Sequence, residues 1–184
     1  MARILMIVGS MRKDSFNRRL AQEIADILGE RAEVSALDYA ALPYMNQDIE
    51  FPAPAEVAQA RAAVQTADGI WICTPEYNFS IPGVLKNLLD WLSRPLKPND
   101  WDGGSVMQGK PVTVSSAAGK SAGRGVLASL AKLLEGMQMQ LIGGTGVGIS
   151  VNPEAFAGGA LRFTPEQTEA LRAQAEAFLA ALAD

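Results

Sequence analysis

The chain alternates between short, continuous apolar runs and longer stretches in which apolar residues recur every three or four positions. A continuous apolar run is typical of a strand that is buried on both faces of a sheet, and the longer spacing is typical of an amphipathic helix. The runs predict five strands, at 4–8, 33–37, 69–74 and 111–116 and from 140 onward. The spaced stripes predict helices at 16–28, 57–67, 84–92, 126–136 and 165–182. Strands and helices in alternation indicate an α/β fold with a parallel sheet covered by helices on both faces.

Two of the predicted helices carry clear end signals. Gly29 directly follows the first helix, and glycine is the usual residue where a helix ends in a left-handed turn. Thr164, Pro165 and Gln167 begin the last helix with the pattern of a capping box and a proline at the first helical position. No repeat or low-complexity tract divides the chain, so we expect residues 1–184 to form a single domain.

Ligands of parallel sheets bind where the strands end, and polar residues follow the first strand at that point. Ser10, Ser15 and Asn17 offer polar side chains, and Arg12 offers a planar fork that suits a phosphate. The helix that begins near residue 16 adds unpaired backbone N–H groups, and residues 12–19 hold four basic side chains against one acidic. The pattern indicates a phosphate site; the alternative is an ordinary polar loop in which Ser15 caps the helix.

The loop after the third strand is stiffened by a proline at each end, Pro75 and Pro82. Between them lie side chains suited to polar recognition, namely Glu76, Tyr77, Asn78 and Ser80. A stiff backbone with exposed N–H and C=O groups suits a planar heteroaromatic ring. An ordinary turn in which Ser80 caps the next helix fits the spacing equally well.

Composition narrows the chemistry. The chain has no histidine, which excludes histidine-based triads and most zinc sites, and one cysteine, Cys73, which we expect to be a buried and inert thiol. The net charge of −4 disfavours nucleic acid as a partner. The first apolar run is too short for a signal peptide or a membrane span, so we expect a cytoplasmic protein with no membrane partner. Because the chain has no histidine, we also expect no metal. If the protein is an enzyme, we therefore expect a bound cofactor to supply its more demanding chemistry.

The two loops together have a family resemblance. Gly9-Ser10-x-Arg12-x-x-Ser15-x-Asn17, with Pro75-Glu76-Tyr77-Asn78-x-Ser80-Ile81-Pro82-Gly83, resembles the NADPH-dependent FMN reductase family, which includes quinone, azo-dye and chromate reductases. The resemblance implies a flavodoxin-like three-layer sandwich with a five-stranded parallel sheet in the order 2-1-3-4-5. It implies that the FMN phosphate is held by Ser10, Arg12, Ser15 and Asn17, and that the isoalloxazine ring is lined by Pro75, Glu76, Tyr77 and Asn78.

In this family a loop rich in serine and glycine after the fourth strand passes close to the flavin ring. The corresponding residues here are Ser116, Gly119 and Lys120. The family often has a Gly-Gly pair where this chain has Ala118-Gly119-Lys120, so the chain departs from the family pattern at this point. Lys120 fits two interpretations equally: a cation that stabilises the reduced ring, or a solvated surface lysine.

The resemblance implies an enzyme that takes electrons from NADPH or NADH onto FMN and passes them, in a ping-pong cycle, to a small-molecule acceptor such as a quinone, an azo compound or free flavin. It implies no catalytic side chain, because the flavin performs the hydride transfer. Two alternatives stay open: a flavodoxin-type electron carrier without its own NAD(P)H turnover, and a partner-binding protein in which FMN is only structural.

The helix expected at 80–94 resembles the helix used for dimer contact in the family, which implies a homodimer or a homotetramer. Its apolar residues are Leu88, Leu89, Trp91 and Leu92; the alternative is that they only face the sheet. The long loop at 95–109, which contains Trp101, is open to three interpretations: a lid over the flavin, a contact with a partner subunit, or a plain surface loop.

Overall fold

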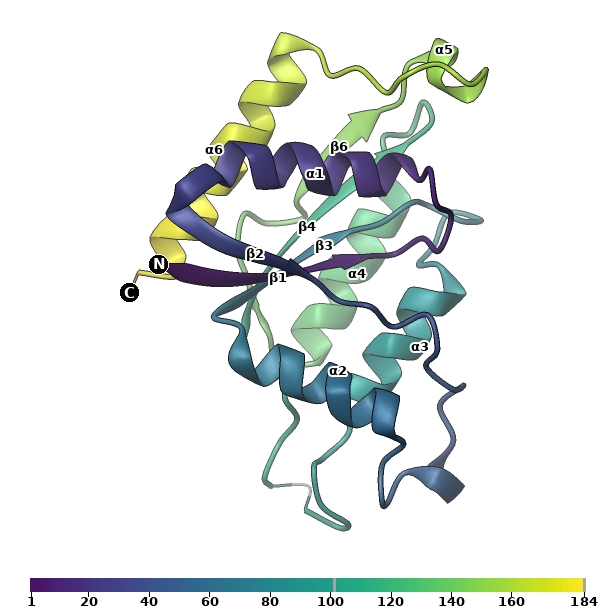
Figure 1. Ribbon diagram of the computed structural model, residues 1–184, viewed down its shortest axis with the longest axis vertical. Coiled ribbons are helices and arrows are strands. Elements are labelled where there is room, and N and C mark those ends of the chain that lie inside the picture. The colour runs from purple at the N-terminus through teal and green to yellow at the C-terminus, as the bar shows by residue number, and fades with distance from the viewer. Residues whose placement is uncertain (101, 184) are drawn as a thin grey trace.

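A computed structural model describes residues 1–100 and 102–183, so Trp101 lies outside the described residues. Within them one parallel sheet has the order β2-β1-β3-β4-β5, with β6 also paired to β4. Its strands are β1 (Ala2–Val8), β2 (Ala32–Ala36), β3 (Gly69–Cys73), β4 (Pro111–Ala118), β5 (Gln140–Leu141) and β6 (Val147–Ser150). The predicted strand order is therefore confirmed (Figure 1).

The sixth strand arises because the fifth position of the sheet is divided in two. β5 pairs with Pro111 and Val112 of β4, and β6 pairs with β4 from Ser115 onward. Between the paired stretches, residues 142–146 lie opposite only two residues of β4. Gly146 ends this bulge with φ +86°, a conformation that glycine adopts at little cost. The strand predicted to start at residue 140 is therefore present, and β6, which was not predicted, forms because the glycine-rich segment leaves the ladder and returns to it.

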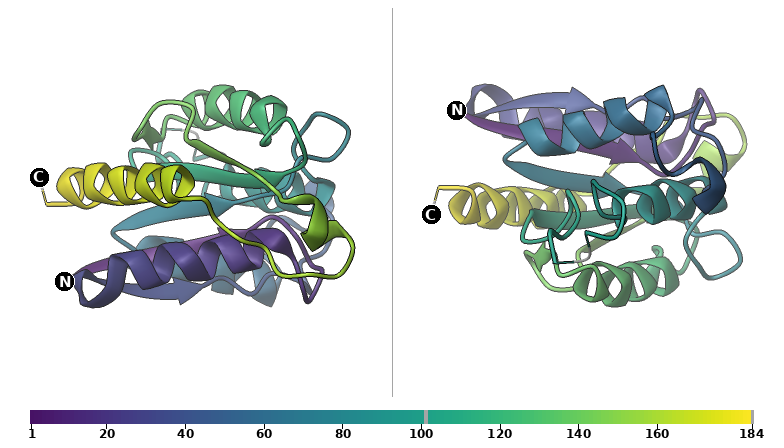
Figure 2. Two further views of the ribbon diagram at one scale, coloured as in Figure 1. Left: turned by 90° about the horizontal axis from the view of Figure 1, so that it is seen from above. Right: turned by 90° about the horizontal axis from the view of Figure 1, so that it is seen from below.

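Helices cover both faces of the sheet, as predicted (Figure 2). α1 (Phe16–Leu28) and α6 (Pro165–Ala181) pack on one face; α2 (Ala55–Thr66), α3 (Gly83–Leu92) and α4 (Arg124–Gly136) pack on the other. Alternate strand residues serve the two layers: Ile4 and Met6 face α1 and α6, whereas Leu5 and Ile7 face the opposite layer. Two short 3-10 turns, Gly29–Arg31 and Gln47–Ile49, and a short helix, α5 (Pro153–Phe156), were not predicted. No described helix has both the length and the hydropathy needed to cross a membrane.

The helix ends match the sequence signals in three places and differ in one. Gly29 ends α1 with φ +55°, and both bonds of the capping box between Thr164 and Gln167 are present. Ser15 caps α1, since its Oγ accepts a hydrogen bond of 3.2 Å from the Asn17 N–H. Ser80 does not cap α3, which begins at Gly83; its backbone is instead held by two hydrogen bonds to Tyr77.

The apolar residues of α3 face their own chain. Leu88, Leu89, Trp91 and Leu92 are at most 1% exposed, and the Trp91 Nε1–H donates to the Pro43 carbonyl at 2.8 Å. The interpretation that these side chains face the sheet is therefore confirmed, and they are not available to a partner subunit.

Cys73 is also buried, at the end of β3, and burial raises the pKa of its thiol far above the ordinary value. A protonated thiol without access to solvent is unreactive, so the expectation of an inert cysteine is confirmed.

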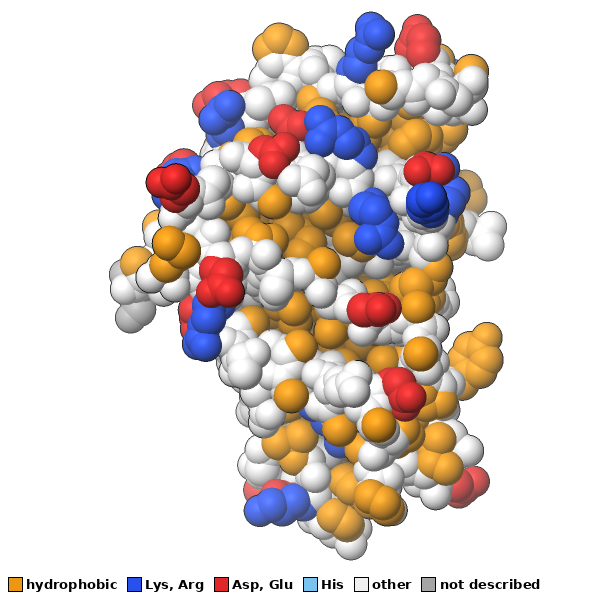
Figure 3. Space-filling view, viewed as in Figure 1, with side chains coloured by type: hydrophobic (Ala, Val, Ile, Leu, Met, Phe, Trp, Pro, Cys, Tyr) orange, Lys and Arg blue, Asp and Glu red, His pale blue; other side chains and the backbone are white. Residues whose placement is uncertain are grey.

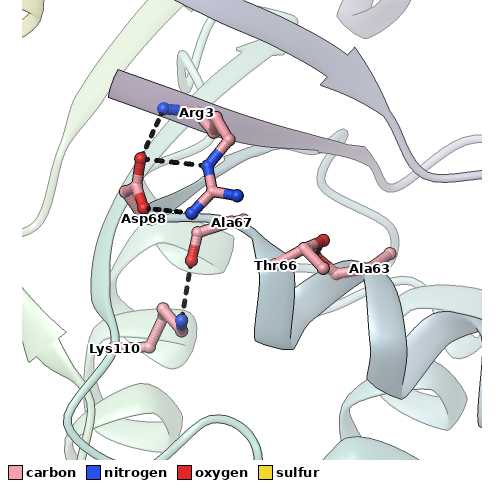
Figure 4. A network of polar contacts seen from close by, with 6 residues as sticks. All are labelled: Arg3, Ala63, Thr66, Ala67, Asp68 and Lys110. Atoms are coloured by element: carbon pink, nitrogen blue, oxygen red, sulfur yellow. Dashed lines mark hydrogen bonds and ion pairs between the residues drawn. The ribbon is translucent and has the colours of Figure 1, made fainter. Parts of the chain in front are cut away.

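A polar network lies at the end of the sheet where β1 and β3 begin (Figure 4). The Asp68 carboxylate accepts hydrogen bonds from the Arg3 backbone N–H at 2.8 Å and from the Arg3 guanidinium at 2.9 Å. Lys110 Nζ donates to the Ala67 carbonyl at 2.7 Å. These contacts fix the loop that follows α2 to the start of β1, on the side of the sheet away from the carboxyl ends of the strands.

The hydrogen bonds from Arg3 hold the pKa of Asp68 below its usual value. A depressed folded-state pKa contributes stability that is present above the unfolded pKa, about 4, and is lost as the pH falls through the folded value. We expect Asp68→Asn to lower the free energy of unfolding slightly at pH 7 and to reduce its dependence on pH below 4, as measured by urea unfolding. Asp102→Asn removes an exposed carboxylate as a control; equal pH slopes for wild type and Asp68→Asn would contradict the expectation.

Candidate functional site

The three polar loops that the sequence singled out converge at the carboxyl ends of β1, β3 and β4, on the right of Figure 1. They enclose a cleft of about 480 Å³. Eight of the eleven predicted binding residues line it, namely Ser10, Arg12, Ser15, Asn17, Pro75, Glu76, Tyr77 and Gly119. The structure therefore brings residues that are more than 100 positions apart into one candidate binding site.

One end of the cleft is suited to an anion. The Arg12 guanidinium lies over the Phe16 ring, 5.0 Å from its centroid, and has no hydrogen bond or ion pair within the described part of the chain. The N-terminus of α1, whose N–H groups carry partial positive charge, lies beside it. Basic side chains gather around this end of α1 in Figure 3. Unused guanidinium donors next to a helix N-terminus are the groups that bind phosphate.

Asn17 connects the first loop to the fourth strand. Its side chain is 1% exposed, donates from Nδ2 to the Ala117 carbonyl at 2.9 Å and accepts from the Ala117 N–H at 2.8 Å. The residue therefore fixes the start of α1 against the end of β4. Sequence reasoning assigned Asn17 to the phosphate and missed this contact, because its partner lies 100 positions away.

The other end of the cleft is bordered by a tight hairpin. Tyr77 and Ser80 exchange backbone hydrogen bonds of 3.0 and 3.1 Å, and the two residues between them have positive φ, +50° at Asn78 and +62° at Phe79. These values fit a type I′ turn, which directs its two central residues away from the strands. Tyr77 lines the cleft and is 52% exposed, whereas Asn78 lies at the tip and does not line it. The prediction that Asn78 borders the bound ring is not supported by this arrangement.

Glu76 joins the second loop to the third. Its carboxylate accepts a 2.9 Å hydrogen bond from Ser121 Oγ and a 2.8 Å bond from the Val126 N–H in the first turn of α4. The N-cap residue of α4 is Gly123, which has no side chain to cap the helix. Glu76 therefore supplies the cap from another loop, and its negative charge is favourable beside a helix N-terminus.

Removal of this cap is expected to loosen both loops. We expect Glu76→Ala to lower the free energy of unfolding by about 2 kcal/mol, because it leaves a helix N-terminus without its acceptor. Glu76→Gln keeps one acceptor oxygen and should lose less than half as much. Chemical denaturation followed by circular dichroism measures both; an Ala variant as stable as wild type would show that solvent replaces the cap.

Comparison with known proteins identifies the family. The profile of the NADPH-dependent FMN reductases matches residues 2–153. The chain belongs to this family. A 2-hydroxy-1,4-benzoquinone reductase of a Burkholderia species is 41% identical over 131 residues, which is 70% of this chain and 71% of that protein. A quinone reductase of Pseudomonas putida is 33% identical over 98% of this chain and 90% of that protein.

Solved structures agree. The flavoenzyme FerB of Paracoccus denitrificans, an NAD(P)H:(acceptor) oxidoreductase, superposes with a TM-score of 0.86 at 28% identity, over 100% of this chain and 98% of that chain. A flavodoxin of Streptococcus pneumoniae shares the fold, with a TM-score of 0.63 at 14% identity over 98% and 99% of the two chains. This reductase is therefore an oxidoreductase of flavodoxin-like fold that uses FMN and NAD(P)H.

Two predicted residues of the third loop do not line the cleft of this reductase. Ser116 is fully buried, and its Oγ has no hydrogen-bond partner within the described residues. It lies beneath Gly123, where an added Cβ would come within 2.1 Å of that oxygen. This position does not support a contact between the hydroxyl and the cofactor, because Ser116 still belongs to β4, where successive side chains point to opposite faces. Lys120 is exposed, in agreement with the surface-lysine interpretation.

The cleft also contains residues that sequence reasoning missed. Phe16 from α1, and Ala155, Phe156 and Gly158 from the segment around α5, line it together with the predicted residues. The segment has a proline, small residues and two glycines, and no helix or strand period that could have placed it.

A larger groove, of about 680 Å³, lies apart from the cleft between α3, α4 and the 95–109 loop. Pro95, Ser105 and Gln108 border it from the loop, Lys132 borders it from α4, and Met137 borders it directly after that helix. No described residue of the loop lines the cleft, so the interpretation of this loop as a lid over the flavin is not supported.

The described residues of the cleft fit FMN. Arg12 and the N-terminus of α1 offer donors for a dianionic phosphate at one end. The Pro75–Tyr77 backbone and the glycine at position 119 allow a flat ring to approach closely at the other. The amphipathic lining, with the aromatic side chains of Phe16, Tyr77 and Phe156, is typical of a cofactor site.

Proposed function

We propose that this reductase transfers electrons from NADPH or NADH through FMN to a small-molecule acceptor, in a ping-pong cycle at the cleft formed by the three loops. The observation that carries the proposal is the Arg12 guanidinium, which has no hydrogen bond or ion pair to the described residues and lies beside a helix N-terminus at one end of that cleft. Quinones are the acceptor class we favour, because relatives that are 33–41% identical are named quinone reductases. Azo compounds and free flavin are further candidates.

In this proposal each part of the chain has a defined task. Ser10, Arg12 and Ser15 bind the phosphate, and the 75–77 backbone, Tyr77 and Gly119 hold the ring. Asn17 and Glu76 keep the three loops in place through their contacts with Ala117 and with α4. When bound, FMN supplies the capacity to accept a hydride from the nicotinamide and to pass the electrons on. The half-exposed Tyr77 leaves room at the open side of the cleft for both substrates in turn.

An anaerobic visible spectrum with FMN, recorded before and after addition of NADPH or NADH, tests the proposal. We expect a protein-bound flavin band that bleaches fully, and parallel double-reciprocal lines when a quinone is then varied against NAD(P)H. A flavin that binds and stays oxidised with both nucleotides would contradict the proposal and favour an electron carrier or a structural flavin. Intersecting lines would overturn the ping-pong cycle alone.

We further propose that the full 1–184 chain acts as one cytoplasmic domain and assembles as a homodimer or a homotetramer. The groove between α3, α4 and the 95–109 loop supports an assembly, since apolar Ile81, Leu133 and Met137 line a surface that the cleft does not use. Light scattering coupled to size exclusion measures the mass of the assembly. Met137→Glu, which places a charge in the groove, should shift the mass toward the monomer; an unchanged mass would exclude this groove as the contact.

A further inference from the structure

Phe156 lies at the cleft although it belongs to a part of the chain beyond the family match. The match ends at residue 153, the first residue of α5 (Pro153–Phe156), and Phe156 is the last residue of that helix. α5 lies at the upper right of Figure 1, and its Phe156 ring contacts Phe16 in the first turn of α1. The Phe156 side chain lines the cleft and is nevertheless 61% exposed. Its position in the lining of the cleft, in contact with the Phe16 ring, points to a role there.

Phe156 is the outer member of a series of three side chains. Its ring packs against Phe16 edge to face, with centroids 5.2 Å apart and an interplanar angle of 82°. The Arg12 guanidinium lies 5.0 Å from the centroid of the same Phe16 ring. Phe16 is thus held between a cation and a second aromatic ring, both favourable contacts.

Arg12 has little else to define its orientation. Its backbone N–H donates to Ser10 Oγ at 3.4 Å, but its guanidinium has no hydrogen bond or ion pair to any described residue. An exposed arginine side chain samples many rotamers, and that freedom is lost when it binds a phosphate. Contact with the Phe16 ring restricts the guanidinium beforehand, and Phe156 restricts the ring.

The loop that carries Phe156 is fixed at its base. The Asn152 side chain accepts from the Arg162 N–H at 3.1 Å and donates to the Ala160 carbonyl at 3.4 Å, so it joins the two ends of the loop. Ala155 and Leu161 anchor it in the core with at most 8% exposure. Phe156 therefore projects to the cleft from a closed loop and not from a free segment.

We propose that Phe156 is a positioning residue for phosphate recognition: it holds the Phe16 ring, and the ring holds Arg12 ready for the phosphate of the cofactor. The inference rests on the proposed placement of FMN in this cleft. It assigns a binding role to the loop at 152–162, which lies almost wholly beyond the residues that the family profile matches.

Titration of the flavin-free full chain with FMN and with riboflavin, which lacks the phosphate, tests the proposal. Loss of an aromatic contact of this kind corresponds to about a fivefold change in affinity. We expect Phe156→Ala to weaken FMN binding about fivefold and riboflavin binding less than twofold, and Phe156→Tyr to restore FMN binding. Phe163→Ala is the matched control, because Phe163 lies under Arg19 at 5.8 Å and does not line the cleft.

A double variant separates positioning from direct contact. In an Arg12→Ala background, Phe156→Ala should change FMN affinity no further, since the side chain through which it acts is gone. Two results would overturn the proposal and indicate direct contact with the flavin. One is that Phe156→Ala weakens the binding of FMN and of riboflavin equally, and the other is that it weakens FMN binding as much in the Arg12→Ala background as in the wild-type chain. If the wild-type chain bound FMN no better than riboflavin, the proposed phosphate site itself would fail; unchanged melting temperatures of the flavin-free variants confirm that folding is intact.

Discussion

Arg12→Ala is expected to weaken FMN binding by about 10- to 100-fold and to leave riboflavin binding nearly unchanged. A hydrogen bond to a charged partner contributes about 1.5–3 kcal/mol, and the Arg12 guanidinium has all its donors available because nothing in the described chain bonds to it. Arg12→Lys keeps the charge and loses the planar fork, so its FMN affinity should lie between the two. Quenching of flavin fluorescence in a titration measures all three proteins.

Arg18→Ala is the matched control for this experiment. Arg18 lies in the first turn of α1, shortly after the loop that carries Arg12, and is exposed, but it does not line the cleft. Removal of either arginine lowers the positive potential around the cleft equally, so only a specific contact distinguishes them. A comparable loss of FMN affinity in both variants would mean that Arg12 acts only through the overall positive potential around the cleft. If Arg12→Ala weakened riboflavin binding as much as FMN binding, Arg12 would contact the ring and not the phosphate.

Gly146→Ala is expected to destabilise the fold by about 3 kcal/mol or more. Gly146 has φ +86°, which an L-residue adopts only with strain. An added Cβ would also lie 2.1 Å from the Val114 carbonyl oxygen, and this backbone atom of β4 cannot move without breaking the sheet. Guanidinium unfolding followed by circular dichroism measures the loss.

Gly144→Ala separates the steric clash from the backbone strain. Gly144 lies in the same bulge with φ +64°, but an added Cβ would meet nothing within 4 Å. We expect a loss of about 1 kcal/mol, which is the strain alone. If the two variants were equally stable, the bulge would be able to move away from β4, and the rigid division of the fifth strand would be in doubt.

The sequence predicted most of what local physics determines. The strands could be predicted because burial on both faces of a sheet requires a continuous apolar run. The helices could be predicted because their apolar residues recur every three or four positions. Caps at Ser15 and Thr164 were readable because a helix N-terminus needs an acceptor within three residues. The first loop was readable for a similar reason: Arg12 and the N-terminus of α1 lie within one short segment.

Long-range contacts account for what the sequence did not reveal. Asn17 bonds to Ala117 and Glu76 caps α4, and neither partner is marked in the sequence by anything near it. For Ser116, a polar residue in a glycine-rich segment suggested a ligand contact, but the strand continues through Ala118 and the side chain is buried. The sequence did not indicate that α5 borders the site, since its residues show neither a helix nor a strand period and only the fold brings Phe156 to Phe16.

The divided fifth strand also makes this edge of the sheet a poor site for pairing with a strand of another molecule. An edge strand presents unpaired N–H and C=O groups that can recruit another chain and start aggregation. Here that edge consists of a two-residue strand, a bulge of left-handed glycines and a four-residue strand, so it offers no long, flat row of donors and acceptors. This edge is therefore a poor template for a strand of another copy, whereas β2 at the opposite edge is a continuous strand of five residues.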